Sequence, residues 1–225
     1  MELALPVAMA ISIGLIHFFG EEIDEYLAGY SFFLASLSAG FTVSYFFIRL
    51  IPETMSNAYL TLNNIFVVAG FTSLYVVEEV VYEREEVFGD IREGFKEVQT
   101  ALLSFYHLVV GMLLGFLSKQ SSHELLLFYL PVLIHTAVNS LAVKEMHEEM
   151  LDNVYIKIFA SFSTLGGVLL INLVSMPQKM LFSILGIVGG AFIYVVVHDA
   201  LDPRKERPIG FVCGVTVFLF IIVLI

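Results

Sequence analysis

Residues 39–53, AGFTVSYFFIRLIPE, and residues 189–203, GGAFIYVVVHDALDP, follow one pattern. Small residues open each stretch, an aromatic and apolar run follows, and a polar end with proline closes it. Each stretch lies in an apolar run of about 20 residues, the length of helix that crosses the hydrocarbon core of a bilayer. The two stretches therefore indicate an internal repeat in a chain of membrane-spanning helices.

The composition also favours a membrane protein. Of the 225 residues, 58% are hydrophobic and 15% are charged, and the mean hydropathy is +0.88. A soluble domain of this size carries more charge and fewer apolar residues. We predict an all-α integral membrane protein, whose first apolar run is kept as a span because it has neither a basic start nor a cleavage pattern. Its single cysteine, Cys213, excludes an intrachain disulfide.

Eight apolar runs are long enough to cross a bilayer. They cover residues 3–20, 27–50, 58–81, 99–118, 125–146, 155–175, 180–201 and 208–225. The longest gap, residues 82–98, is rich in acids, and we predict a cytoplasmic loop there, with a short interfacial helix as the alternative. The chain is then a single transmembrane domain over residues 1–225.

Basic residues set the expected orientation. If the spans alternate in direction, one side collects eight basic residues in its connections and the other side three. Cytoplasmic connections carry the excess of lysine and arginine, so we expect both termini outside the cell membrane. The stretches 39–53 and 189–203 then cross in opposite directions. This predicts inverted repeats, spans 1–3 and 6–8, around a central pair formed by spans 4 and 5.

The acidic residues lie in short blocks near span ends, at residues 21–25, 78–86 and 145–152, and the formal net charge is −11. This charge argues against nucleic acid as a partner. The blocks are compatible with gathering cations at a pore mouth, and equally with solvated helix ends. The expected partners are thus the lipid bilayer and a cation, and a homodimer is a candidate assembly.

Two histidines mark the candidate site. His107 and His135 lie about nine and about eleven residues into spans 4 and 5, which places both near mid-depth. A polar side chain at that depth is costly and indicates a functional site. Asn139 follows His135 by one helical turn and shares its face. The simpler alternative is that His107 joins neighbouring helices by a hydrogen bond to Ser104 or Asn139.

The ordered motifs resemble those of the ZIP family of zinc and iron transporters. Residues 49–53, RLIPE, resemble its second-span ending His-Leu-x-Pro-Glu, with arginine replacing histidine. Residues 135–143, HTAVNSLAV, follow its fifth-span pattern His-Glu-x-Pro-Glu-Gly-Leu-Ala-Val. His107 matches the first residue of the fourth-span pattern His-Asn-x-x-Asp/Glu-Gly, and residues 163–166, STLG, stand where the family has Glu-Pro-Leu-Gly.

The resemblance implies eight spans, external termini, a cytoplasmic loop after span 3 and a metal site between spans 4 and 5. Several of the family's oxygen ligands are missing, since those positions hold Leu108, Gly111, Thr136, Asn139 and Ser163. We therefore expect a reduced, single metal site of His107, His135 and Asn139. A divalent cation such as zinc or iron would be the substrate, moved by alternating access, and no cofactor is expected.

Polar residues near span ends are secondary candidates. Arg49 and Glu53 could form an entrance, and Arg49 could instead reach the outer surface or pair with Glu53, one turn away. A second group could form an exit site or be ordinary interfacial residues. This group contains His17, Glu21, His198 and Asp199. Gly111 with Gly115, and Gly186 with Gly190, predict close helix packing.

Two alternative functions remain. The chain could be a ZIP-derived scaffold or accessory protein that carries no metal and acts through its acidic loop. It could also be a membrane-embedded zinc hydrolase using His107, His135 and His198 with Asp199 as base, because three imidazoles and a water make a catalytic zinc site. His198 is expected near the inner surface, away from the other two histidines, so we expect a carrier and no enzyme.

Overall fold

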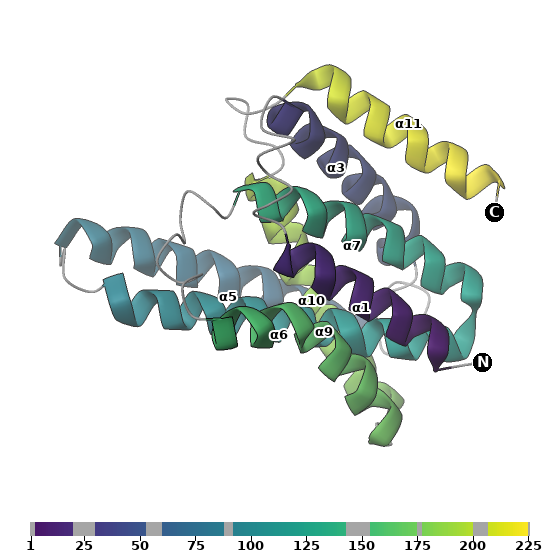
Figure 1. The fold of residues 1–225 in the computed structure, drawn as a ribbon, viewed down its shortest axis with the longest axis horizontal. Helices are drawn as coiled ribbons and strands as arrows, with labels where there is room; N and C mark the ends of the chain where they lie inside the picture. Colours follow the sequence, from purple (N-terminus) through teal and green to yellow (C-terminus); the bar gives the residue numbers. More distant parts are fainter. Residues whose placement is uncertain are drawn as a thin grey trace.

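The computed structural model describes residues 3–19, 30–52, 60–87, 92–142, 154–174, 177–199 and 207–224. Within these residues the fold is all-helical, with eight α-helices, a five-residue π-helix and no strand (Figure 1). The prediction of an all-α protein is confirmed for this part of the chain. In order, the helices are α1 Ala4–Phe18, α3 Ser31–Tyr45, η2 Phe46–Leu50, α5 Leu60–Val87, α6 Arg92–Gln120, α7 Ser122–Ala142, α9 Val154–Leu173, α10 Gln178–Asp199 and α11 Pro208–Leu224.

Each of the eight apolar runs falls on one α-helix, but two helices are longer than their runs. Helix α5 continues to Val87 and α6 begins at Arg92, so most of the stretch 82–98 is helical rather than a loop. Glutamate, arginine and lysine are strong helix formers, and they allow both helices to continue beyond their apolar segments. Between these helices, residues 88–91 lie outside the described residues.

Three helix pairs form the most extensive contacts of the described chain: α6 with α9, α5 with α10, and α3 with α11. The partners in each pair run parallel, as contacts between α3 and α11 illustrate. Gly210 meets Phe33, and Gly214, one turn later, meets Leu37. Helix α7 packs against α3, α1 and α6, and α1 lies on α9 (Figure 1). Both chain ends lie at the same end of the bundle in this view.

Glycines let each parallel pair approach backbone to backbone. A Cβ at Gly111 would lie 1.8 Å from the carbonyl oxygen of Thr164, and one at Gly167 would lie 1.8 Å from that of Leu108. Gly115 likewise faces α9, at Ile171. These contacts confirm the predicted packing face of Gly111 and Gly115, because only residues without a side chain permit such a close approach.

The two repeat stretches use equivalent glycines. Gly40 and Gly190 are 150 positions apart, at matching places in the two stretches. A Cβ at Gly40 would lie 2.1 Å from a backbone oxygen of α11, and one at Gly190 would lie 1.9 Å from a backbone oxygen of α5. Gly186 also packs on α5, at Asn63, which confirms the predicted face of Gly186 and Gly190. Helix α3 thus joins α11 in the way that α10 joins α5.

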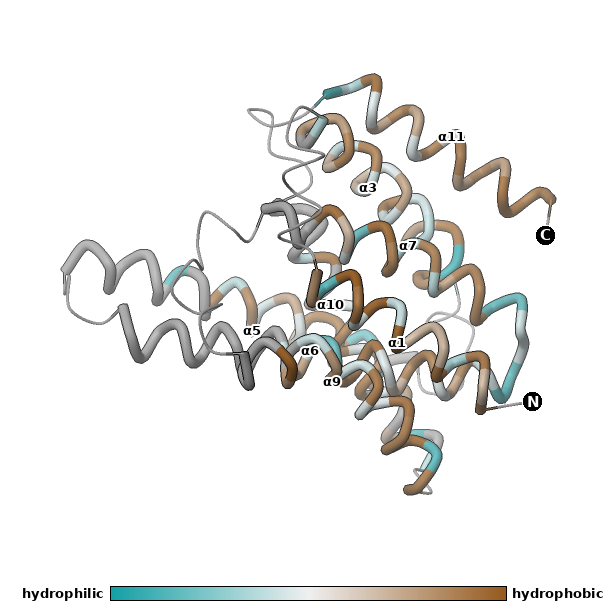
Figure 2. The backbone as a smooth tube through the Cα atoms, viewed as in Figure 1, coloured by the Kyte–Doolittle hydropathy of each residue, from teal (hydrophilic) through white to brown (hydrophobic). Residues whose placement is uncertain are grey.

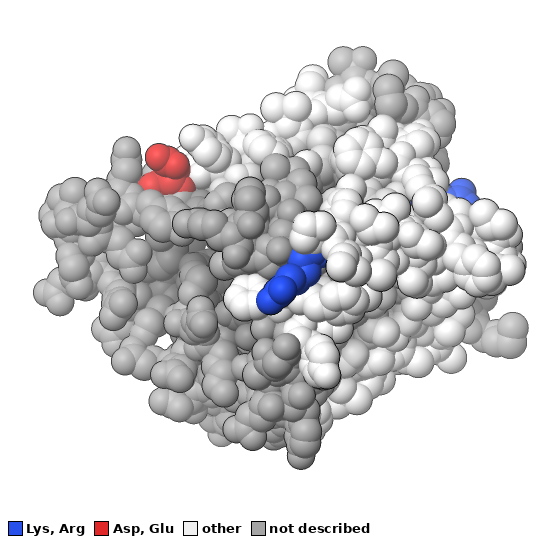
Figure 3. Space-filling model, turned by 90° about the horizontal axis from the view of Figure 1, so that it is seen from above, with Lys and Arg blue, Asp and Glu red and all other residues white. Residues whose placement is uncertain are grey.

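The interior holds an apolar core together with several polar side chains, and large apolar side chains are also exposed on the outside. Leu173 is 83% exposed and Val223 is 82% exposed. The buried polar side chains are Ser36, Ser38, Thr42, Ser44, Asn63, Ser104, His107, Thr136, Ser161, Ser163 and Thr164. Figure 2 shows the apolar character of the described helices, and Figure 3 shows a few isolated charged side chains among uncharged ones on one face.

One described segment, Phe32–Leu50, has the length and hydropathy needed to cross a membrane. It comprises 19 residues of mean hydropathy 1.4. Shorter apolar helical segments of 10–17 residues are Ala4–Phe18, Leu62–Val76, Ser122–Val138, Ser161–Leu173, Phe182–Ala191 and Pro208–Leu224.

Adjacent glycines in α9 provide a matched test of the packing. We expect Gly167→Ala to destabilise the protein by about 1–3 kcal/mol, because its Cβ would overlap the backbone of α6 at Leu108. Gly166→Ala should be neutral or slightly stabilising, since its Cβ would meet only a Leu108 methyl group at 3.9 Å. The midpoint of thermal unfolding in detergent measures both, and equal midpoints would contradict the backbone contact between α6 and α9.

Candidate functional site

Two histidine rings from different helices meet in the interior. His17 lies in the last turn of α1 and His107 lies in the middle of α6. Their ring centroids are 5.0 Å apart and the ring planes are inclined by 78°, an edge-to-face contact. His107 is only 4% exposed. The bundle therefore places two imidazoles from different helices in contact with each other.

Hydroxyl groups of α9 accompany both rings. Thr164 Oγ1 lies 3.3 Å from Nδ1 of His107, and Ser161 Oγ lies 3.5 Å from Nδ1 of His17. The alternative that His107 joins neighbouring helices by a hydrogen bond named Ser104 or Asn139 as the partner. The observed partner is Thr164, the buried Ser104 hydroxyl has no hydrogen-bond partner, and the Asn139 side chain is outside the described part of the structure. Helix α9 takes that role because Gly111 lets α6 approach it at Thr164.

His135, the second histidine of the predicted site, lies on α7. Thr136, the next residue on α7, is buried. The side chain of Asn139, the third residue of the predicted site, lies outside the described part of the structure. We call His17, His107 and His135 the imidazole cluster.

The place of His17 differs from the sequence-based expectation of an exit site. Its ring contacts His107, the residue expected at mid-depth. The physical reason is the difference in helix length. Helix α1 has 15 residues and ends one residue after His17, whereas α6 begins at Arg92, about four turns before His107. The end of the short helix thus lies level with the middle of the long one.

The other predicted exit and entrance residues are only partly described. Glu21 and Glu53 lie outside the described residues. The backbone of His198 and Asp199 ends helix α10, but their side chains are outside the described part. The exit-site and hydrolase groupings that include them stay predictions.

The cluster offers neutral donors. Among the residues that the structure describes, no group of three or more His, Cys, Asp or Glu side chains converges closely enough to hold a metal ion. A cation entering this region would meet imidazole nitrogens and the hydroxyls of Ser161 and Thr164. Imidazole suits zinc, copper, iron and nickel, and waters can complete the coordination of a weakly held ion.

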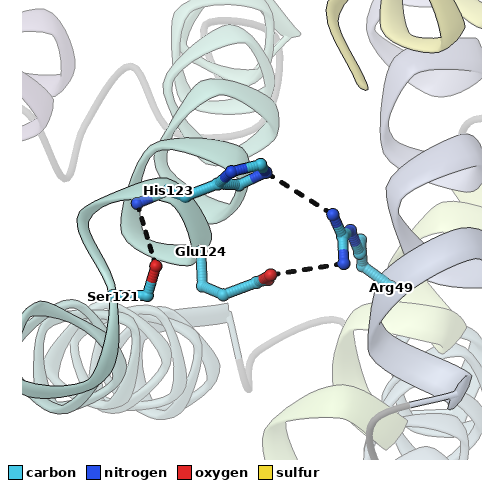
Figure 4. Close-up of polar contacts among 4 residues, drawn as sticks. All are labelled: Arg49, Ser121, His123 and Glu124. Carbon is cyan, nitrogen blue, oxygen red and sulfur yellow. Dashed lines mark hydrogen bonds and ion pairs between the residues drawn. The ribbon is translucent and has the colours of Figure 1, made fainter. Parts of the chain in front are cut away.

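A charged group lies at the corner between α6 and α7, where Arg49 of η2 reaches it (Figure 4). Arg49 Nη1 lies 3.2 Å from Glu124 Oε1, and Nη2 lies 3.5 Å from Nε2 of His123. The backbone N–H of His123 in turn donates to Ser121 Oγ at 3.2 Å. The Arg49 and Glu124 side chains are 33% and 27% exposed. This set of four residues is the corner cluster.

The sequence analysis missed the corner cluster because it considered only Glu53 as a partner for Arg49. Glu53 is near in sequence, whereas Glu124 comes from a helix 75 positions later. One local signal was present, because Arg49 lies at the polar end of the repeat stretch 39–53, near Pro52. The structure adds a π-helix there, in which the backbone N–H of Ile51 donates to the carbonyl of Phe46. Such one-turn π segments often occur at functional sites.

No known protein family matches the chain, and a search of curated proteins finds no similar sequence.

The ion pair of the corner cluster can be tested by a double-mutant cycle. We expect Arg49→Gln and Glu124→Gln each to lower the free energy of unfolding, and the double variant to lose less than the sum of the two. The coupling should be about 1 kcal/mol, at the upper end for partly exposed ion pairs. Thermal or denaturant unfolding in detergent measures it. Effects that add to within about 0.3 kcal/mol would mean that the two side chains do not interact.

Proposed function

We propose that the protein is a membrane carrier for a divalent metal cation such as zinc or iron, related to the ZIP transporters. The observation that carries this proposal is the imidazole cluster, in which His17 and His107 touch in the interior. His107 is buried and His17 partly buried, and an imidazole in an apolar interior is costly to keep without a function. Binding of a cation by both rings is a function that explains why they are kept at this place.

The distribution of side chains supports a place in the bilayer. Many leucine, valine and phenylalanine side chains are exposed on the outer faces, in addition to those that form the apolar core, and several serine, threonine and histidine side chains are buried. Large exposed apolar surface is typical of a protein that contacts lipid or a partner. Helices in lipid gain nothing from burying apolar groups against each other, and instead pack through small residues and internal hydrogen bonds. We place the protein in the plasma membrane, with both termini outside.

The packing supports inverted repeats and alternating access. Helix α3 packs on α11 and α7, and α10 packs on α5 and α6. In an inverted repeat, α3 (span 2) corresponds to α10 (span 7), α11 (span 8) to α5 (span 3), and α7 (span 5) to α6 (span 4). The contacts of α3 with α11 and α7 therefore correspond to the contacts of α10 with α5 and α6. Transporters built from such repeats commonly hold their substrate near the midplane, between the repeats. The imidazole cluster draws its residues from α1, α6 and α7, and α9 packs on α1 and α6.

His17, whose ring contacts His107, is proposed as a further ligand beside the predicted set of His107, His135 and Asn139. Neutral imidazole nitrogens hold a divalent ion more weakly than a site containing carboxylates, because they do not neutralise its charge in a medium of low dielectric constant. Weak binding suits a carrier that must release its substrate.

The scaffold and hydrolase alternatives make different demands. A scaffold needs no cation at the imidazole cluster, so its function would survive loss of the histidines. A hydrolase needs His198 beside His107, and the side chain of His198 lies outside the described part of the structure, whereas the carrier uses the observed contact of His17 with His107. The carrier is therefore the function that the observed contacts favour.

Uptake by proteoliposomes tests the carrier. Purified protein should move Zn²⁺ or Fe²⁺ into vesicles, and His107→Ala and His17→Ala should each reduce the initial rate at least tenfold by removing a ligand. His135→Ala should also reduce the rate, because it removes an imidazole of the predicted site.

His123→Ala is the matched control, because it removes an imidazole that belongs to the corner cluster. This variant should keep most of the uptake. Normal uptake by a folded His17, His107 double alanine variant would sink the carrier proposal and favour the scaffold.

The orientation has its own test, which uses the single cysteine. In a Cys213→Ser background, Leu3→Cys and Leu224→Cys place thiols at exposed positions near the two ends. Both should react with a membrane-impermeant maleimide in intact cells. Arg84→Cys, on the side expected to be cytoplasmic, should react only after lysis. The opposite labelling pattern would reverse the orientation.

A further inference from the structure

One face of α3 and η2 carries a row of buried polar atoms without partners. Ser38 Oγ, Thr42 Oγ1 and Arg49 Nε form no hydrogen bond, and they are three of the six such side-chain atoms among the described residues. Ser38 is 2% exposed and Thr42 is 0% exposed. Positions 38, 42, 45 and 49 are three or four residues apart and follow one helix face. We call Ser38, Thr42 and Arg49 the polar row.

Other buried hydroxyls of the same helix are paired. Ser36 Oγ accepts from the backbone N–H of Arg207 at 2.8 Å, and Ser44 Oγ donates to the carbonyl of Gly40 at 2.7 Å. A buried hydroxyl without a partner has lost its hydrogen bonds to water and gained none in return, which is costly. The cost in α3 is therefore concentrated on the face that carries the polar row.

The polar row faces helix α7. Arg49 pairs with Glu124, and the ring of Tyr45 lies 5.9 Å from that of Phe128. Residues four positions apart on one helix thus meet residues four positions apart on the other, in reverse order. The two helices are antiparallel along this face, and these two contacts fix their register.

The register brings a break in the hydrogen bonding of α7 beside the row. It places Thr42 level with Pro131 and Ser38 level with His135. Pro131 has no N–H, so the carbonyl of Leu127, one turn earlier, cannot receive its helical hydrogen bond. Leu127 is 0% exposed. Two hydroxyls of α3 and one carbonyl of α7 therefore lack their ordinary partners at neighbouring levels of one helix interface.

We propose that the interface of α3 with α7 is a hydration site, in which ordered water bonds to the hydroxyls of Ser38 and Thr42 and to the carbonyl of Leu127. Water both donates and accepts, so it can serve hydroxyls and a carbonyl together, and a buried water commonly makes about three such bonds. The polar row begins at Arg49, which is 33% exposed, and ends level with His135. The site stands on these helix contacts and goes beyond the proposed carrier function.

Water-edited solid-state NMR tests the site directly. In protein labelled with ¹³C-threonine in lipid bilayers, magnetisation passes from water to nearby side chains, and single valine variants identify the threonine signals. We expect several-fold faster transfer to Thr42 than to Thr164, which is equally inaccessible at 0% exposure but has His107 as a partner at 3.3 Å. Ser38→Ala removes one partner of the water and should slow the transfer to Thr42. Transfer to Thr42 no faster than to Thr164 would overturn the site.

Thermal unfolding separates a hydrated interface from a dry one. Thr42→Val keeps the shape of the side chain and removes the hydroxyl. A hydroxyl buried dry and unpaired would make this variant more stable than the wild type, because valine has no polar group to desolvate. For the hydrated site we expect a lower midpoint of unfolding, since the water loses a partner, and a raised midpoint would refute it. Helical content from circular dichroism confirms that the variant is folded.

The hydration site and the carrier fail separately. If water reaches Thr42 but the vesicles take up neither Zn²⁺ nor Fe²⁺, the hydration site holds and the carrier function falls. If uptake is normal while transfer to Thr42 only matches transfer to Thr164, the carrier stands and the hydration site is refuted.

Discussion

The close approach of helix backbones at glycine is the constraint on which the structure depends. In the pairs of α6 with α9, α5 with α10, and α3 with α11, glycines lie directly against the partner's backbone. Without a side chain at these positions, the backbones come close enough for many dispersion contacts at short range. The small residues thus determine how closely each pair of helices packs.

The close packing also explains how polar groups are tolerated inside. Ser161 and Thr164 approach the rings of His17 and His107 because α1 and α6 touch α9 one turn away from those rings. A larger residue at Gly14 or Gly111 would separate the helices and leave imidazole and hydroxyl groups buried without partners, which is costly in an apolar medium. The helix contacts and the candidate site therefore form one unit.

The corner cluster shows a different use of polarity, at an end of the bundle. Arg49 lies beyond the apolar part of α3, where a π-helix ends that segment, and its guanidinium bonds to Glu124 and His123. These groups are partly exposed and can be hydrated. The imidazole cluster, by contrast, contains the nearly inaccessible His107. Charged pairs thus lie where water is available, and neutral donors lie where it is not.

The amino-acid sequence by itself determined that the described residues are helical and where the apolar part of each α-helix lies, because apolar runs broken by proline and charge depend only on local order. It did not determine where α5 ends or where α6 begins, since the charged residues there continue both helices. It also identified His107, His135 and the packing glycines, since their types and spacing stand out along a single helix. Only the tertiary structure decided the partners. His17 meets His107, Thr164 replaces Ser104, and Arg49 pairs with Glu124. These contacts depend on relative helix lengths and on which helices lie side by side, and both follow from packing in three dimensions rather than from neighbours in sequence.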